Sequence, residues 1–375
     1  MKYKTLSSFN LKDKTVLVRS DLNSDLKNGK PIISDRIRES VKTISELKRK
    51  KAKVIIMAHQ GRPKTKNFTS LREHAKLLSK FTKVKFVSDV IGLKAIKAIK
   101  NLKPGQALLL ENVRTLKQEY HPDRSEFERY LVPLFDIYIN DAFSNSHRNN
   151  ASVVSFPKYI KKHGIGRLME KELKALEKIK SKKGLYILGG AKPEDNIKLL
   201  KSKNKVIATG LFDSLCLMAK GQKLGKQELV VKKYKPLIKK IKNKVKKVGT
   251  SIDFIDETGK IISINELPLN KKLLGIGPKT IENIKSEIKK YKVIFMKGPA
   301  GVYHGKRFAG GTKEILKAIA KNKGTTILGG GHLNTFLEEY KISKSSFTYV
   351  SLSGGALIAY LAGEKLPGLE VLKRK

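Results

Sequence analysis

The sequence contains one cysteine, Cys216, and no cluster of cysteine and histidine residues. An internal disulfide framework is therefore excluded, nothing indicates a structural zinc site, and a reducing cytoplasm is the expected location. No apolar run approaches the roughly 20 residues that span a membrane, and the N-terminus lacks the apolar core of a signal peptide. With 375 residues, the chain is long enough for two domains that each have a core.

Acidic residues are also scarce. The 33 aspartates and glutamates stand against 80 lysines and arginines, a net charge of +47 that raises the possibility of nucleic-acid binding. Most of these cations are lysines spread along the whole chain, as expected of a default surface residue, which argues against nucleic acid as the main partner; any such binding would be non-specific. The densest basic run, residues 232–247, holds nine lysines in sixteen residues. Apolar residues recur in or beside it at helical spacing: Ile238, Ile241, Val245 and Val248. We interpret the run as a core-facing helix with a solvated face; weak, salt-sensitive binding of RNA or anionic surfaces is the alternative.

Arginine is rare as well. Only 13 of the 80 basic residues are arginines, and 11 of these lie at or before Arg167. Where lysine is the default cation, an arginine indicates a need for a planar donor with two prongs. Strands are predicted at 15–19, 53–58, 83–87, 107–110 and 136–139. Five cations follow these strands or open the helix after the first one: Arg36, His59, Arg62, Arg114 and Arg148.

The carboxyl ends of parallel strands lie along one edge of an open sheet, where ligands bind. Arg36 falls in the first turn of a helix predicted from Asp35 to Lys50, with Ser34 as its N-cap. Five cations converging on that edge would hold a small, multiply charged anion such as a phosphorylated acid. The alternative is that each arginine pairs with a local carboxylate.

The stretch from Gly184 to Asn196 has a different chemistry. Its apolar residues 185–188 predict a buried strand, and the glycine pair that follows would let the backbone approach a ligand closely. A helix predicted to begin near Pro193 would point free N–H groups at an anion, and Lys192 adds a mobile positive charge. The stretch therefore predicts a phosphate cradle.

Further strands are predicted at 206–209, 261–264, 273–276, 293–296, 326–328 and 347–350, most of them followed by glycine. We expect a nucleotide to lie across this second sheet, and we interpret an apolar-faced helix over 164–180 as the connector between the two halves. A strict P-loop is absent, because the spacing after Gly301 is one residue too short and lacks Ser or Thr. No G-x-G-x-x-G follows a strand, and no protein-kinase signature is present.

Ten short motifs, taken in order, give the chain a resemblance to phosphoglycerate kinases over nearly its whole length. They are VRSDLN (18–23), DRI (35–37), HQGRP (59–63), LLENVR (109–114), NDAFSNSHR (140–148), ILGGAK (187–192), KGPAGVY (297–303), FAGGTKE (308–314), GGGH (329–332) and LPGLE (366–370). One such motif would be weak, but ten at family-like spacing are specific. GGGH in place of the commoner GGGD is similar to archaeal members.

The resemblance implies an α/β protein with two Rossmann-like three-layer domains, each with a parallel sheet, joined by a hinge helix. Residues 1–160 would bind phosphoglycerate, and a tail from about 363 to 375 would return to that domain. Residues 161–182 would form the inter-domain helix, and residues 183–362 the nucleotide-binding domain. The implied enzyme is a hinge-bending phosphotransferase of glycolysis and gluconeogenesis. It passes a phosphoryl group reversibly from 1,3-bisphosphoglycerate to ADP, giving 3-phosphoglycerate and ATP, as a monomer or homodimer without membrane contact.

Site residues are carried over by motif match. Phosphoglycerate would be bound by Asp21, Leu22, Asn23, Arg36, His59, Gln60, Gly61, Arg62, Arg114, His147 and Arg148. The nucleotide, with its Mg²⁺, would be bound by Gly190, Lys192, Asn196, Gly210, Gly277, Lys297, Pro299, Gly301, His304, Gly330, Gly331, His332 and Leu333. In the ATP-consuming direction the nucleophile is the substrate carboxylate, which is already ionised at neutral pH, so no general base is needed. Catalysis would reduce to positioning and charge stabilisation by Arg36 and Lys192.

Several positions on the nucleotide side depart from the family pattern. Asn196 replaces a common second lysine, and Lys297 replaces the usual asparagine before Gly-Pro. His304 falls where a glutamate usually meets the ribose hydroxyls, and His332 where an aspartate is associated with magnesium. The metal would then rely on phosphate oxygens and water, and nucleotide selectivity would be relaxed. Ordinary loop roles for the two histidines are the alternative.

Two other functions fit the same sequence. One is a basic anion- or nucleic-acid-binding protein on this fold, bound non-specifically to its partner and with weak or lost kinase activity. The other is a different small-molecule kinase on the same fold, whose substrate would have to fit the cations of the first half.

Overall fold

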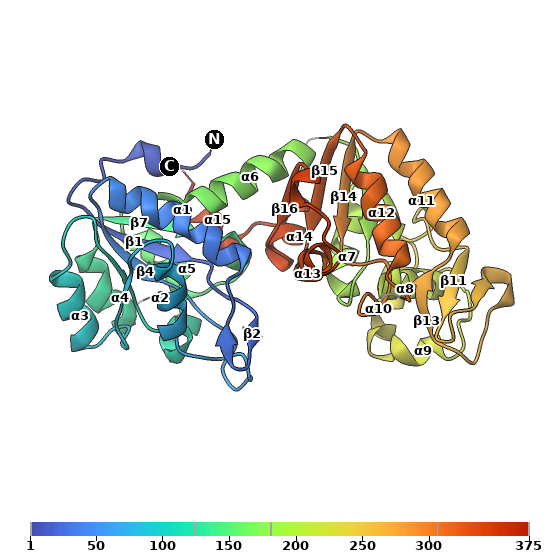
Figure 1. Ribbon diagram of the computed structural model, residues 1–375, viewed down its shortest axis with the longest axis horizontal. Helices are drawn as coiled ribbons and strands as arrows, with labels where there is room; N and C mark the ends of the chain where they lie inside the picture. The colour runs from blue at the N-terminus through green and yellow to red at the C-terminus, as the bar shows by residue number, and fades with distance from the viewer. Residues whose placement is uncertain (1, 124, 181, 306, 374–375) are drawn as a thin grey trace. The chain divides into compact units, whose positions relative to one another are not determined.

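The computed structural model describes residues 2–123, 125–180, 182–305 and 307–373 (Figure 1). The chain divides into two compact units. Unit 1 comprises Met1–Leu173 and Lys365–Lys375, and unit 2 comprises Lys174–Glu364. The first division falls within helix α6 (Arg167–Lys180). Within the described ranges, no helix combines the length and the apolar character needed to cross a bilayer.

Unit 1 is built on a sheet of six parallel strands. In spatial order these are β5 (Lys85–Phe86), β6 (Ala107–Leu109), β4 (Lys53–Met57), β1 (Thr15–Ser20), β7 (Ile137–Asp141) and β8 (His163–Ile165). Strand β1 lies between two neighbours in register, with Val18 beside Ile56 of β4 and Ile139 of β7. The central strands are buried along nearly their whole length, as expected of parallel strands covered on both faces.

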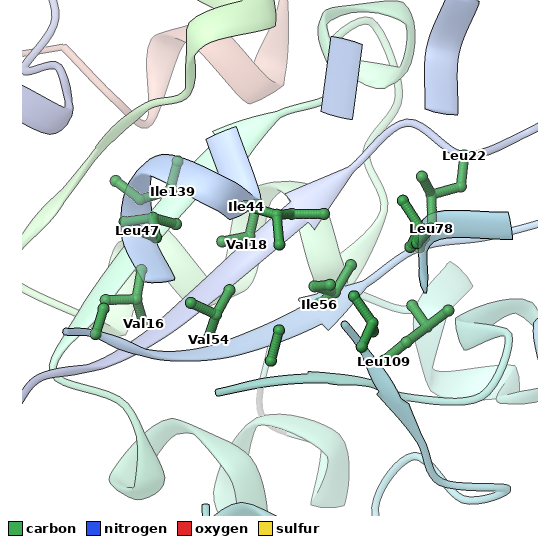
Figure 2. Close-up of a cluster of buried hydrophobic side chains, with 14 of the residues drawn as sticks. Val16, Val18, Leu22, Ile44, Leu47, Val54, Ile56, Leu78, Leu109 and Ile139 are labelled. Carbon is green, nitrogen blue, oxygen red and sulfur yellow. The ribbon is translucent and has the colours of Figure 1, made fainter. Parts of the chain in front are cut away.

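Helices cover both faces of this sheet: α1 (Asp35–Arg49), α2 (Arg72–Ser79), α3 (Leu93–Lys100), α4 (Glu126–Leu131), α5 (Ala151–Tyr159) and α15 (Pro367–Glu370). Alternate residues of a strand face the same layer, so Val16 and Val18 of β1 bury together. Figure 2 shows this layer, in which Ile44 of α1 packs over them. On the other face, the Tyr138 hydroxyl of β7 donates to the Ser152 carbonyl of α5, 2.8 Å away.

The last helix of the chain, α15, packs within unit 1. The N–H of Gly368 donates to the Ser146 carbonyl at 2.9 Å, and the Asn140 amide donates to the Gly368 carbonyl at 3.4 Å. A Cβ at position 368 would lie 2.5 Å from the Val153 side chain, so glycine permits this approach. Helix α15 therefore lies against the loop and helix that follow β7.

Unit 2 is built on a sheet of five parallel strands. In spatial order these are β10 (Lys205–Ala208), β9 (Leu185–Leu188), β14 (Val293–Lys297), β15 (Thr325–Gly329) and β16 (Tyr349–Ser351). Its helices are α7 (Pro193–Asn196), α8 (Gly210–Ala219), α9 (Gln227–Val230), α10 (Lys235–Ile241), α11 (Pro278–Lys290), α12 (Gly310–Ala320), α13 (Gly331–Glu339) and α14 (Gly355–Leu361). Apolar residues of α11, α12 and α13 share one core with β9 and β14. Parallel α/β units confirm the predicted fold class.

Two strands predicted for the parallel sheet of unit 2 belong instead to a small antiparallel sheet. Strands β12 (Ile261–Ser263) and β13 (Leu273–Ile276) both pair with β11 (Asp253–Asp256), which was not predicted. Phe254 and Ile262 belong to a small, separate hydrophobic core that also contains Leu217 of α8. Apolar spacing identifies a strand but not its partner. The predicted place of these two strands in the parallel sheet was therefore wrong.

The connector helix begins later than the predicted residue 164. Gly164 and Ile165 belong to β8, and the N–H of Ile165 donates to the Lys4 carbonyl at 2.9 Å. A Cβ at Gly164 would lie 2.5 Å from the Lys4 oxygen, so glycine lets the start of the chain approach this strand. A three-residue strand and the first turn of a helix look alike in apolar spacing, which explains the error.

The basic run at 232–247 forms a shorter helix than its spacing suggests, because α10 ends at Ile241 and turns follow. Ile241, Val245 and Val248 are buried, Ile238 is half-buried, and all nine lysines of the run are exposed. The interpretation as a solvated face over buried apolar residues is confirmed.

Candidate active site

The predicted cations of unit 1 lie at the carboxyl ends of neighbouring strands. Strands β6, β4, β1 and β7 are consecutive in the sheet and all parallel, so the residues that follow them share one edge. Arg114 follows β6, His59 follows β4, Asp21 follows β1 and Arg148 follows β7. The sheet order thus brings together side chains that are up to 127 residues apart in the sequence, from Asp21 to Arg148.

Arg36 enters this edge from the first turn of α1. Its Nη1 forms an ion pair with the Oδ2 of Asp21, and the Ser144 hydroxyl donates to the same oxygen at 2.7 Å. The other oxygen of Asp21, Oδ1, is buried and has no hydrogen-bond partner among the described residues. The hydroxyl of the N-cap residue Ser34 is hydrogen-bonded to the Ser24 hydroxyl, 2.9 Å away, and makes no capping hydrogen bond to the helix. Asp21 therefore holds Arg36 and keeps one acceptor available.

His59 is buried at the centre of the edge, and its Nδ1 lies 3.1 Å from Nη2 of Arg19. A guanidinium can only donate, so Nδ1 accepts and the ring proton of neutral His59 sits on Nε2. Burial and the nearby charges of Arg19 and Arg114 hold the pKa of His59 well below its usual range. His59 is thus a neutral imidazole that presents an N–H donor.

Arg19 itself is held by a buried polar chain behind the edge. Its Nε donates to the Ser152 hydroxyl at 2.8 Å, and that hydroxyl donates to Glu119 at 2.8 Å. The same carboxylate accepts from the Ser152 N–H at 2.9 Å. Burial raises the pKa of Glu119, while the Arg19 charge opposes that rise. Sequence reasoning missed this chain, although an arginine inside a buried apolar strand signals a partner, because burying an unpaired charge is costly.

Three guanidinium groups converge without carboxylate partners. Among the described residues, no carboxylate lies within ion-pair distance of Arg62, Arg114 or Arg148. Burial, followed by repulsion from Arg19 and Arg148, lowers the pKa of Arg114 to about 10, and burial and Arg62 lower that of Arg148. The Nε atoms of Arg114 and Arg148 are buried and unbonded. The alternative that each arginine pairs with a local carboxylate therefore holds for Arg36, and it fails for Arg62, Arg114 and Arg148.

The remaining predicted residues of unit 1 differ in what they face. The Gly61 N–H donates to Asn23 at 2.8 Å, and the Gly61 carbonyl accepts from Arg114, which ties both loops together. The Gln60 side-chain amide is occupied by hydrogen bonds within the protein, among them two to the Ser24 backbone at 2.9 Å. Leu22 is buried in the hydrophobic core. His147 precedes Arg148 in the same turn and is half-buried.

Unit 2 contains a cavity of about 450 Å³. It is lined by six of the residues predicted to bind nucleotide: Gly190, Gly210, Pro299, Gly301, His304 and His332. Aromatic rings are part of the lining, and the Tyr303 ring centroid lies 4.0 Å from that of His304 and 5.6 Å from that of His332. The lining also includes apolar residues of β13 and two residues of α9, Val230 and buried Gln227. An apolar cavity lined in part by rings suits a planar base.

The glycine pair after β9 packs against the loop after β14. The N–H of Gly189 donates to the Lys297 carbonyl at 2.7 Å, and that of Gly190 to the Pro299 carbonyl at 3.0 Å. A Cβ at Gly189 would lie 2.3 Å from the Pro299 oxygen. These glycines therefore serve close contact between two backbones, and their N–H groups are occupied. Helix α7, which follows, is only four residues long.

Lys192 is exposed at the turn before α7, and two buried side chains lie beneath that turn. The Lys297 ammonium lies 2.9 Å from Oδ1 of Asn196, 3.3 Å from the Lys192 carbonyl and 3.6 Å from Oδ2 of Asp195. The Asn196 amide donates to the Gly189 carbonyl at 3.1 Å. Burial lowers the pKa of Lys297, and the Asp195 charge opposes this. Lys297 and Asn196 thus support the turn from within.

Other predicted nucleotide residues lie outside the cavity lining. Gly277 is the N-cap of α11, and its N–H donates to the Asp253 carbonyl at 2.9 Å. Leu333 is buried in the core of unit 2. Gly330, with a φ of 100°, and Gly331 begin α13 in open space, next to His332. In the described part of the chain, no three residues among His, Cys, Asp and Glu group closely enough to hold a metal ion.

Comparison with known proteins agrees with this architecture. The family model described as phosphoglycerate kinase matches residues 6–364. The chain is 39% identical to a phosphoglycerate kinase of Sulfurisphaera tokodaii, with 98% of this chain and 95% of that one covered. It is also 39% identical to one of Methanobacterium bryantii, with 98% and 96% covered. The crystal structure of phosphoglycerate kinase from Pyrococcus horikoshii superposes with a TM-score of 0.89 at 33% identity, covering 98% of each chain.

Proposed function

The chain belongs to the phosphoglycerate kinase family, and we propose that it passes a phosphoryl group reversibly between 1,3-bisphosphoglycerate and ADP. The products are 3-phosphoglycerate and ATP, so the acceptor in the reverse direction is a carboxylate. Family membership over residues 6–364 supports this assignment, and the chemistry of both units is consistent with it.

Phosphoglycerate is assigned to the strand ends of unit 1. The observation that carries this assignment is the convergence of Arg62, Arg114 and Arg148 with no carboxylate partner among the described residues. Such groups bind phosphate and carboxylate oxygens through two-pronged, charge-assisted hydrogen bonds. The free acceptor of Asp21 suits the hydroxyl of the substrate, and the Nε2–H of His59 suits one of its anionic oxygens.

The nucleotide is assigned to the cavity of unit 2. Its base would lie between the apolar lining and the rings of Tyr303 and His304, and its phosphates would extend toward the Lys192 turn and the N-terminus of α13. The N–H groups that open α13 favour an anion, because they have no partner within the helix.

Catalysis rests on charge and position in this proposal. The 3-phosphoglycerate carboxylate needs no deprotonation at neutral pH, so no general base has to be found. Arg36, oriented by Asp21 and Ser144, and Lys192, on its supported turn, would stabilise the charge that develops on the transferring group.

Magnesium would enter the site as part of the nucleotide substrate. The described residues offer no cluster of carboxylates for it, and the imidazoles of His304 and His332 are poor partners for a hard cation. The ion would therefore be held by phosphate oxygens and water, as Mg²⁺ often is. The cytoplasmic location expected from the single cysteine stays a prediction.

The direct test is a coupled assay of the purified full chain. ATP formation from 1,3-bisphosphoglycerate and ADP, and its reversal with 3-phosphoglycerate and ATP, are expected. Absence of turnover in both directions, by protein that still binds ADP, would contradict the proposed activity and favour a binding protein on this fold.

A further inference from the structure

We propose that Lys297 is a positioning residue for phosphoryl transfer: through Asn196 it holds the Lys192 turn and places a second positive charge beneath the nucleotide phosphates. This inference rests on the proposed function, which assigns those phosphates to unit 2. It adds a role for two buried side chains that do not line the nucleotide cavity.

The contacts of Lys297 converge on one short turn. Its ammonium lies within hydrogen-bond distance of the Lys192 carbonyl and of Oδ1 of Asn196, and near the carboxylate of Asp195. Asn196 is fully buried, and its amide donates in turn to the Gly189 carbonyl. Lys297 and Asn196 therefore link the end of β14, the glycine pair after β9 and the backbone of Lys192, whose own side chain is exposed.

The cost of burying this ammonium indicates that it does more than fill space. The Lys297 side chain is 8% exposed, whereas the carboxylate of Asp195 lies 3.6 Å away and is 24% exposed. A well-packed apolar or amide side chain could join the two loops without desolvating a charge. A positive charge kept under a turn that bears Lys192 raises the electrostatic potential at that turn, which favours a polyphosphate.

The sequence supports the same conclusion from another direction. Positions 196 and 297 both depart from the pattern of the family, and the structure shows that they are hydrogen-bond partners at 2.9 Å. The asparagine and the lysine have in effect exchanged places, so the pair retains one ammonium and one amide. The charge comes from the end of β14 rather than from α7.

Binding of ADP and of adenosine to the full chain separates a charge role from a structural one. Lys297→Met removes the ammonium and keeps the length of the side chain. We expect it to weaken ADP binding by about tenfold and to leave adenosine binding within about twofold of wild type. The control is Lys292→Met, which alters an exposed lysine just before the other end of β14 and should change neither affinity. Isothermal titration calorimetry measures both ligands.

Two outcomes would overturn the proposal. Unchanged ADP binding in Lys297→Met would show that the charge does not act on the phosphates. Equal losses for ADP and adenosine would show that the side chain only supports the fold. Because these are binding measurements, they decide the question even if wild type shows no ATP formation, a result that would instead refute the proposed activity.

The reciprocal exchange provides an independent check. Lys297→Asn alone should weaken ADP binding and lower kcat, because the site loses its second charge. Adding Asn196→Lys to that variant returns one ammonium and one amide to the same contact, and ADP affinity should recover to within about threefold of wild type. A double variant no better than Lys297→Asn would contradict the exchange. Adenosine binding reports whether each variant has kept its fold.

Discussion

The guanidinium of Arg19 lies 3.1 Å from Nδ1 of His59, and this contact determines which ring nitrogen of the histidine carries its proton. Arginine has no acceptor, so the proton of neutral His59 is placed on Nε2. Behind Arg19, Ser152 and Glu119 complete a buried chain. In the proposed function, Arg19 would thus act through His59 on the phosphoglycerate at the strand ends.

Replacing Arg19 should separate positioning from folding. Arg19→Met is expected to raise the KM for 3-phosphoglycerate about tenfold, because the His59 donor is no longer fixed. It should also lower the free energy of unfolding by about 3 kcal/mol, because Glu119 is left buried without its charge partner. Steady-state kinetics and urea denaturation measure the two effects. Adding Glu119→Gln should recover stability but not KM; recovery of both would mean that Arg19 only supports the fold.

The unpaired arginines should act on the acid and not on the nucleotide. Arg148→Met is expected to raise the KM for 3-phosphoglycerate at least tenfold, about the effect of losing one charge-assisted contact, while the KM for ATP stays unchanged. The matched control is Arg129→Met, which alters an exposed arginine of α4 with a loose ion pair to Glu126 at 3.9 Å. A parallel rise in both KM values for Arg148→Met would contradict the assignment of the two units.

The proposed transition-state cations should change kcat. Arg36→Ala and Lys192→Ala are each expected to lower kcat by at least about 10²-fold, because a cation at a transferring phosphoryl group is typically worth 10³–10⁵ in rate. Lys201→Ala, at an exposed lysine nearby in sequence, should leave kcat unchanged. Near-normal turnover in either variant would refute its assignment.

Nucleotide selectivity should be broad for the sugar. Apart from buried Asp213, no carboxylate lines the cavity in the described part of the chain, so the ribose hydroxyls lack a charged acceptor. Loss of a neutral hydrogen bond costs about 1 kcal/mol, and 2′-deoxy-ADP should therefore have a KM within about tenfold of that for ADP. His304→Glu should increase the preference for ADP. A strong preference already in wild type would contradict this explanation.

A buried carboxylate should make stability depend on pH. Burial raises the pKa of Asp141 to about 7 from its usual value of 3.8, so the folded state binds the proton more tightly than the unfolded state. Its contribution to stability is therefore complete below pH 3.8 and is lost as the pH rises toward 7, by roughly 1.4 kcal/mol per pH unit at most. Asp141→Asn should flatten this dependence in urea titrations between pH 4 and 8, whereas exposed Asp25→Asn should not.

The sequence was sufficient for most strands of the two parallel sheets and for the cations that follow the strands of unit 1, because buried strands and the residues after them are local patterns. It did not reveal partners that meet only in three dimensions. Arg19 lies in an apolar strand, and Glu119 is 100 residues away, so nothing local joins them. The glycines after β9 illustrate the same limit: a glycine pair indicates close approach, but only the fold shows that another backbone approaches.

The return of the chain to unit 1 has a consequence for biosynthesis. Helix α15 supplies the contacts of Gly368 with Ser146 and Val153, yet a ribosome makes it after the whole of unit 2. Domains generally fold as units while the chain is being made. Unit 2 therefore has its full sequence before unit 1 does, and the loop that carries His147 and Arg148 acquires its final support only after helix α15 has left the exit tunnel.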